Sequence, residues 1–147
     1  MTDGYLVDTN VISELARRTP QPEVRQWADA VDPGALFISV ITMGELRKGI
    51  VLHPDPIRRA RLEQWKRDVL AVWFGNRILG VTEAIAERWG ELSARAQREG
   101  RSLPVLDGIM AATAYEHGLT VVTRNVEHFQ VTGVDVLNPW PSSLLMP

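Results

Sequence analysis

The chain of 147 residues contains no cysteine, which excludes a disulfide framework and any metal site built from thiolates. It also lacks an apolar run near the roughly 20 residues that a membrane-spanning helix requires, and it lacks the basic and then apolar leader typical of secretion. We therefore expect a protein with no membrane partner, working in a reducing cytoplasm.

The chain also has no marked excess of charge of either sign. Its formal net charge of −2 does not by itself indicate a nucleic-acid binder. The charges are nevertheless uneven, because residues 47–67 hold seven basic and two acidic residues, whereas residues 101–147 hold two basic and four acidic ones. An acidic pocket beside a basic flank suits a site that holds a metal and a phosphate backbone together. The alternative is a solvated helix face.

Several common catalytic motifs are missing. The three histidines do not have HxxxH or HExxH spacing, and the chain has no Walker A loop, no GxGxxG loop and no serine in a nucleophile elbow. A zinc hydrolase, a P-loop NTPase and a serine hydrolase therefore find no support. The apolar content of 45% and the charged content of 23% are those of a globular protein. The length predicts a single domain over residues 1–147.

Short apolar runs rich in β-branched residues alternate with helical patterns, which predicts an α/β protein with parallel crossovers. Apolar residues with helical spacing form four stripes between the first four strands. The predicted strands are residues 5–7, 37–41, 78–81, 119–123 and 134–137. The predicted helical stripes are Val11, Ile12, Leu15 and Ala16; Val24, Trp27, Ala28 and Val31; Leu62, Trp65, Val69 and Trp73; and Ala86, Trp89, Leu92, Ser93 and Ala96.

The tryptophans on these stripes are expected in the core. For the stripe that contains Trp65 and Trp73, the alternative is an interface with a partner, because an apolar face larger than a core can cover usually marks an interface. Prolines 20 and 22 are expected to separate the first two helices, and prolines 54 and 56 to break the long stretch after Glu45.

Three carboxylates fall where the pattern turns helical. Asp8 directly follows the first predicted strand, Glu45 lies just past the second, and Asp107 opens the helical stretch 107–114. In an open α/β sheet such positions line one crevice. Each close pair of acids there would cost roughly 4 kcal/mol at about 4 Å and an effective dielectric constant of about 20. A divalent cation relieves this repulsion, and oxygen-only ligation suits Mg²⁺ or Mn²⁺. The pattern therefore predicts metal-dependent chemistry on a phosphate.

Each acid also has a structural explanation. Glu45 fits a capping box with Thr42, in which it would reach back to the Thr42 backbone amide. Asp107 lies in a first helical turn, where the macrodipole favours a carboxylate. Asp8, followed by Thr9 and Asn10, fits loop and capping chemistry. From the pattern alone, a shared metal site and three separate caps both remain open.

Four segments in order resemble the motifs of PIN-domain proteins. They are residues 6–15, which begin LVDTN, then 42–50, 106–114 and 122–129. The ending VLNPW at residues 136–140 is similar to the VapC and FitB branch, the toxin halves of bacterial toxin–antitoxin pairs. The resemblance extends from Tyr5 to Trp140.

The resemblance implies a PIN-like three-layer α/β/α sandwich around a central parallel five-stranded sheet in the order 3-2-1-4-5. It also implies a magnesium- or manganese-dependent ribonuclease acting on RNA, a cognate antitoxin and a homodimer. Asp8, Glu45 and Asp107 match the acidic positions of the family, as catalytic residues and metal ligands, with Glu45 bound directly or through water. Asn10 would cap the following helix while Thr9 orients Asp8.

The fourth motif departs from the family pattern. Where members commonly have an aspartate, this chain has Asn125, or His128 three residues later. Asn125 can offer a neutral carbonyl oxygen to a cation or hold its water, but it adds no charge. Its amide can instead close a turn after the preceding strand. The missing charge weakens the expectation of a second bound metal more than that of the first.

The predicted reaction is hydrolysis of an RNA phosphodiester. The cation would polarise the phosphate, Glu45 or Asp107 would orient or deprotonate a water, and Arg47 and Lys48 would position the RNA backbone. An aspartyl-phosphate phosphatase is a rival, but it would need an aspartate where the chain has Asn10. A non-catalytic PIN-like nucleic-acid-binding or regulatory module, with a degenerate fourth motif, is the other alternative.

Overall fold

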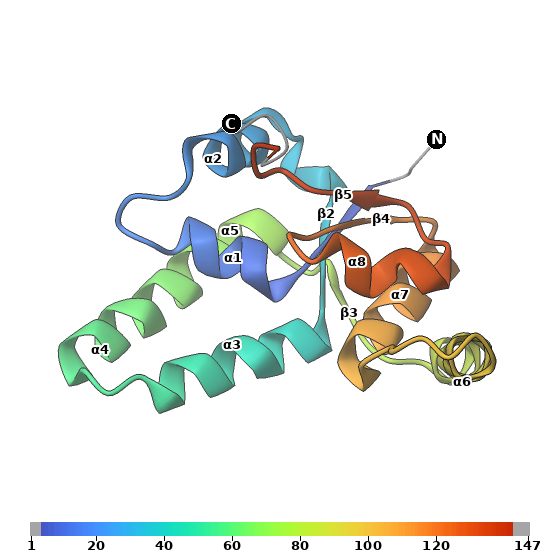
Figure 1. The fold of residues 1–147 in the computed structure, drawn as a ribbon. Coiled ribbons are helices and arrows are strands. Elements are labelled where there is room, and N and C mark those ends of the chain that lie inside the picture. Colours follow the sequence, from blue (N-terminus) through green and yellow to red (C-terminus); the bar gives the residue numbers. More distant parts are fainter. Residues whose placement is uncertain (1–3, 143–147) are drawn as a thin grey trace.

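The computed structural model describes residues 4–142. Five parallel strands form one sheet in the order β3-β2-β1-β4-β5 (Figure 1). The strands are β1 (Tyr5–Val7), β2 (Leu36–Ser39), β3 (Ile78–Leu79), β4 (Thr120–Val122) and β5 (Val136–Leu137). The sheet is parallel throughout and has the strand order that the resemblance implies.

Helices connect the strands. They are α1 (Thr9–Leu15), α2 (Pro22–Ala30), α3 (Val40–Leu52), α4 (Pro56–Trp65), α5 (Ala71–Phe74), α6 (Glu83–Arg98), α7 (Val105–His117) and α8 (Val126–Phe129), with short 3₁₀ turns η1 (Pro33–Ala35) and η3 (Gln130–Thr132) and a π-helical segment η2 (Lys66–Leu70). The predicted proline breaks are correct, because α2 and α4 both begin at a proline.

Adjacent residues of the central strands point to opposite faces of the sheet, as strand geometry requires. Leu6 and Val121 pack in one core with α6, α7 and α8, whereas Val7 and Val122 pack in a second core with α1, α2 and α5. The sheet is therefore the middle of three layers (Figure 1).

The second strand is shorter than predicted. It ends at Ser39, whose hydroxyl accepts a hydrogen bond from the Ile41 backbone amide and so caps α3. Val40 and Ile41, which were expected in the strand, are the first residues of that helix. The error arose because a run of β-branched residues crosses the boundary, and only the cap marks where the strand ends.

The third helical stripe is rotated by a π-helical turn. The hydrogen bonds of a π-helix join residues five apart rather than four, so η2 shifts the buried face by one residue. Leu70 and Phe74 are therefore buried in place of Val69 and Trp73. Trp65 and Trp73 pack against the same core, with ring centroids 6.2 Å apart and the rings edge to face. Trp65 and Trp73 therefore contribute to the core, while Leu62 and Val69 are partly exposed.

The fourth stripe, on α6, also needs a correction, because Ile85 is buried and Ala86 is exposed. Trp89 packs on the neighbouring helix α7 at Gly108. A Cβ atom at Gly108 would lie 2.7 Å from Trp89 Cδ1, so only glycine allows this approach. The close packing of α6 on α7 sets the position of Asp107, the residue before Gly108.

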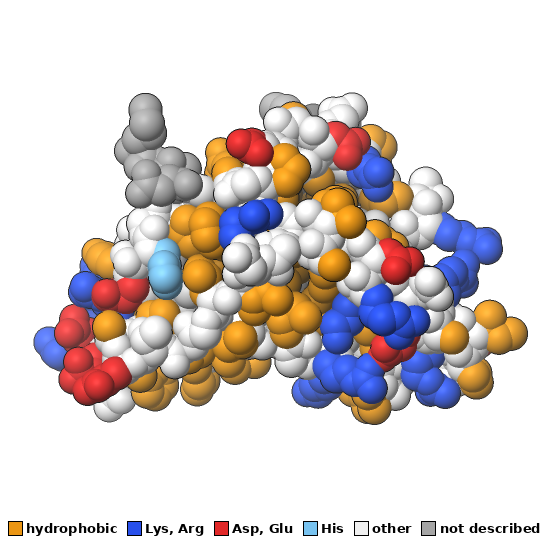
Figure 2. Space-filling model, turned by 180° about the vertical axis from the view of Figure 1, so that it is seen from behind, with side chains coloured by type: hydrophobic (Ala, Val, Ile, Leu, Met, Phe, Trp, Pro, Cys, Tyr) orange, Lys and Arg blue, Asp and Glu red, His pale blue; other side chains and the backbone are white. Residues whose placement is uncertain are grey.

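Among the residues that the structure describes, no helix is both long and apolar enough to cross a membrane. The basic residues of α3 and α4 gather at one end of the molecule (Figure 2). This is the basic flank predicted from residues 47–67.

Candidate active site

A cleft opens where β1 and β4 end and where α1, α3 and α7 approach one another. All three predicted acids line it, together with Asn125. The lining residues are Asp8, Thr9, Asn10, Ser13, Glu14, Arg17, Glu45, Asp107, Arg124, Asn125 and Trp140. The cleft lies at the carboxyl ends of parallel strands, where the strand order reverses around β1.

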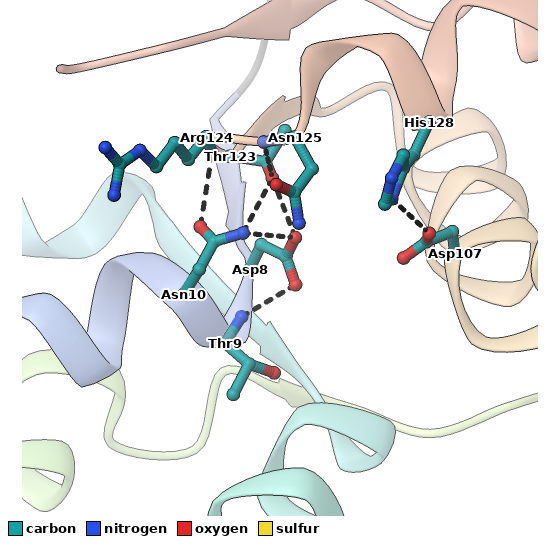
Figure 3. Close-up of polar contacts among 8 residues, drawn as sticks. All are labelled: Asp8, Thr9, Asn10, Asp107, Thr123, Arg124, Asn125 and His128. Carbon is teal, nitrogen blue, oxygen red and sulfur yellow. Dashed lines mark hydrogen bonds and ion pairs between the residues drawn. The ribbon is translucent and has the colours of Figure 1, made fainter.

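Asp8 is held by a network of donors (Figure 3). Its Oδ1 accepts from the Thr9 backbone amide at 2.7 Å, and its Oδ2 accepts from Thr123 Oγ1 at 2.8 Å and Asn10 Nδ2 at 3.2 Å. The side chain is buried, and burial raises the pKa of Asp8, although the bonds from Thr123 and Thr9 oppose that rise. Because burial disfavours the ionised form of Asp8, binding of a proton or of a cation to this carboxylate is favoured.

The hydroxyl of Thr123 connects three parts of the site. It donates to Asp8, and it accepts from Asn10 Nδ2 at 3.1 Å and from the Asn125 backbone amide at 3.0 Å. One donor and two acceptor positions exhaust what a hydroxyl offers. Sequence reasoning assigned Thr123 no role. Its place directly after the strand beside β1 was the available signal.

Two local predictions at these residues are wrong. Asp8, not Asn10, is the N-cap of α1, while Asn10 bonds to Asp8 and accepts from the Arg124 backbone amide at 3.2 Å. Glu45 does not form a capping box, because Ser39 caps α3 a full turn before Thr42. Instead, Glu45 Oε1 accepts from Thr9 Oγ1 at 2.5 Å, which ties α3 to α1 across the cleft.

Asp107 lies in the first turn of α7, as predicted, and its Oδ2 is 2.9 Å from His128 Nδ1 (Figure 3). Burial raises the pKa of Asp107, His128 opposes the rise, and the charge of Glu45 adds to it. The charge of Asp107 in turn adds to the rise in the pKa of Asp8. Asp107 thus repels both Asp8 and Glu45 within one cleft.

Asn125 precedes α8, and its side chain points toward the Asp8 carboxylate (Figure 3). The turn after β4 is closed by the backbone amide of Asn125, which donates to Thr123 Oγ1. The Asn125 side chain makes no capping bond to α8. The Asn125 side chain lines the cleft, and the turn is closed without it.

The sequence agrees with this geometry. The sequence model of the PIN-domain family matches residues 5–134. This segment is most of the chain and includes all three acids.

The chain belongs to the PIN-domain family.

Three relatives of this PIN domain extend the comparison. A VapC ribonuclease of Sinorhizobium fredii is 35% identical over 92% of this chain and 96% of its own length. The crystal structure of FitAcB from Neisseria gonorrhoeae has a TM-score of 0.88 and 35% identity, over 94% of this chain and 99% of that one. A toxin–antitoxin complex from Klebsiella pneumoniae has a TM-score of 0.69 and 30% identity, over 95% of this chain and 100% of that one.

The donor set of this PIN domain suits a divalent cation. Its three carboxylates share one cleft, and hard cations such as Mg²⁺ prefer oxygen ligands. Within residues 4–142, no three acidic or histidine side chains are gathered closely enough to form a ready-made metal site. Glu45 and Asp107 are instead bonded to Thr9 and His128. The fit of this cleft to a divalent cation therefore rests on its carboxylate oxygens and on the repulsion that Asp107 exerts on Asp8 and Glu45.

Sequence reasoning missed a fourth acid of the cleft, Glu14. It is buried, and it accepts from Arg17 at 3.3 Å and from the Gln21 backbone amide at 3.0 Å. Glu14 thereby holds Arg17 at the rim of the cleft. Arg47, predicted to position RNA, forms an ion pair with Glu63 of α4.

Proposed function

We propose that this PIN domain is a metal-dependent endoribonuclease and the toxin of a toxin–antitoxin pair. One observation carries the proposal: Asp8, Glu45 and Asp107, which are 37 or more positions apart in the chain, all line one cleft at the carboxyl ends of the strands. Its similarity to a VapC ribonuclease and to a toxin–antitoxin complex supports the choice of reaction and role.

In the proposed reaction Asp8, Asp107 and Glu45 would hold one Mg²⁺ or Mn²⁺, Glu45 directly or through water. When bound, the cation supplies positive charge against the phosphate and acidifies water. Asp107 or Glu45 would orient the attacking water and accept its proton while the water oxygen bonds to phosphorus and the bond to the leaving ribose oxygen breaks. Asn125 adds a neutral oxygen. The Thr9 bond to Glu45 and the His128 bond to Asp107 fix the two carboxylates that face the water.

We assign backbone contacts to Arg17 and Arg124 rather than to Arg47. Both line the cleft, whereas Arg47 does not and pairs with Glu63 of α4. Arg17 also pairs with an acid, but that acid, Glu14, is itself part of the cleft. Phosphate contacts of this kind position a strand without reading its sequence. They would hold the RNA beside the acids.

Incubation of the purified protein with structured RNA tests the reaction. We expect cleavage with Mg²⁺ or Mn²⁺ and none with EDTA. Cleavage that persists in EDTA would contradict metal dependence. Binding of RNA without cleavage in either metal would favour the non-catalytic module.

Asn125→Asp tests whether position 125 borders the cation. The change adds a negative charge with almost no change in volume, so the protein without metal should be less stable. Cation affinity should rise, because charged oxygen ligands bind divalent ions more strongly. We therefore expect a larger difference between the melting temperatures with and without Mn²⁺ than in the wild type.

Asn76→Asp is the matched control, since Asn76 is an exposed turn residue outside the lining of the cleft. It adds the same charge and should leave the Mn²⁺-dependent difference unchanged. An equal difference in the wild type and in Asn125→Asp would place Asn125 outside the site.

The proposed antitoxin site includes an apolar groove beside the cleft, between α1, α3 and α4. Ser13, Arg17 and Glu45 line both the groove and the cleft, so one bound segment can cover both. The other lining residues are Ala16, Leu46, Gly49, Ile50, His53, Arg58, Leu62, Trp65 and Lys66. A partner with an apolar segment and acidic flanks would match this surface, because its cations lie at the rim.

Gly49→Gln tests the groove. A Cβ atom at Gly49 meets nothing within 4 Å, so the longer side chain can enter the groove without disturbing the fold. We expect it to weaken capture of the cognate antitoxin at least about tenfold in a co-purification assay, and to stabilise α3 by up to about 1 kcal/mol. Gly90→Gln on α6, where a Cβ atom also meets nothing within 4 Å, is the control. Equal capture by both variants would exclude the groove.

The homodimer belongs to the same proposal. Sedimentation equilibrium of the protein without antitoxin should give twice the mass of the chain of 16.5 kDa. A single-chain mass would contradict it.

A further inference from the structure

Trp140 is the one tryptophan that lines the acidic cleft in the described part of the chain. It follows β5, and its backbone amide donates to Asn138 Oδ1 at 3.0 Å. The indole is half-buried against the core that also holds Val7 and Val122. The ring is therefore fixed by the core and by the turn, and part of it borders the cleft.

The guanidinium of Arg124 lies over this ring. Its central carbon is 5.3 Å from the centre of the Trp140 ring. The backbone amide of Arg124 donates to Asn10 Oδ1, and Asn10 Nδ2 donates to Asp8. An aromatic surface and a cation are thereby joined to the Asp8 network through two hydrogen bonds.

Core packing alone does not account for this arrangement. The other tryptophans have apolar or helical surroundings: Trp27 lies edge-on to Tyr5, Trp65 lies edge-on to Trp73, and Trp89 packs on Gly108. Trp140 instead lines a cleft whose other residues are polar or charged. An aromatic ring beside a cation in a polar cleft is the combination that binds single-stranded nucleic acid, because every base has a face that stacks.

We propose that Trp140 stacks a nucleobase of the RNA strand beside the phosphate bound at the acidic site, and that Arg124 moves from its place over the ring to contact the adjoining phosphate. The inference rests on the proposed ribonuclease function and names the part of its substrate that this corner of the cleft recognises. The stacked base must be unpaired, because a base within a helix offers only its edges. The substrate is therefore RNA that is single-stranded next to the cut.

Trp140→Leu tests the stacking, since leucine keeps an apolar side chain against the core and removes the aromatic face. All proteins carry Asp8→Asn so that the RNA stays intact. The probes are fluorescein-labelled oligoadenylate and a ribose-phosphate strand of the same length without bases. We expect Trp140→Leu to weaken binding of oligoadenylate about tenfold and to leave binding of the abasic strand unchanged. Trp140→Phe should retain most of the affinity.

Two comparisons separate stacking from other effects. Arg124→Gln should weaken both probes alike, since a phosphate contact does not depend on bases. Trp27→Leu, at a half-buried tryptophan packed against the same core but outside the cleft, should weaken neither.

An equal loss on both probes in Trp140→Leu, or the same loss in Trp27→Leu, would overturn the stacking role. The proposed reaction fails by a different result, namely the absence of RNA cleavage by the wild-type protein with Mg²⁺ and Mn²⁺. The two failures are therefore distinguishable.

Discussion

Asp8→Asn should lower the rate of RNA cleavage at least about 100-fold, in the range that loss of a preorganised electrostatic group costs an enzyme. The change removes one charge from the proposed cation site with almost no change in volume. Single-turnover cleavage with Mn²⁺ measures the effect. Asp29→Asn, at an exposed residue of α2 that pairs with Arg25, is the control and should cleave normally.

The same variant should remain folded, and its stability should depend differently on pH. Because the pKa of Asp8 is raised in the folded protein, the ionised carboxylate is less favourable there than in the unfolded chain. The contribution of Asp8 to stability is therefore most favourable below the ordinary aspartate pKa and is lost as the pH rises through the raised value. Asp8→Asn lacks this loss.

Thermal melts without metal at several pH values test this sign. We expect Asp8→Asn to melt at or above the temperature of the wild type at neutral pH, with the difference shrinking as the pH falls toward the ordinary aspartate value of 3.8. A variant that cleaves RNA at the normal rate, or that is unfolded at neutral pH, would refute the role given to Asp8.

Thr123→Val should destabilise the protein by about 2–3 kcal/mol. Valine has nearly the same shape but removes the hydroxyl on which Asp8, Asn10 and the Asn125 backbone amide converge. The loss of its bond to Asp8 should also raise the pKa of Asp8 further, because that bond is the largest influence that lowers it. Less of Asp8 is then ionised near its pKa, so the acidic limb of the pH–rate profile should move to higher pH.

Thr113→Val provides the comparison for Thr123→Val. Thr113 is equally buried, but its hydroxyl donates only to the Ile109 carbonyl within its own helix. Denaturant unfolding should show a smaller loss, and the pH–rate profile should not move. Equal effects of the two substitutions would mean that Thr123 serves packing alone.

Local patterns in the sequence predicted most of the secondary structure. Strand β1 has the predicted bounds, and α2 and α4 begin at the expected prolines Pro22 and Pro56, because φ restriction and the missing amide act on their immediate neighbours. The errors lie where a tertiary or capping contact decides. Ser39 ends β2 before the β-branched run does, and the π-turn at η2 shifts the buried face to Leu70 and Phe74.

The sequence by itself determined that Asp8 follows a strand and that Glu45 and Asp107 lie near the starts of helices, positions that line one edge of a parallel sheet. Only the tertiary structure decided what holds each acid. Thr9 bonds to Glu45 across 36 positions of the chain, Thr123 to Asp8 across 115, and His128 to Asp107 across 21. No periodicity of one helix or strand spans such separations. Packing the layers against the sheet creates these pairs, and it also brings Trp140 into the cleft that Asp8 lines.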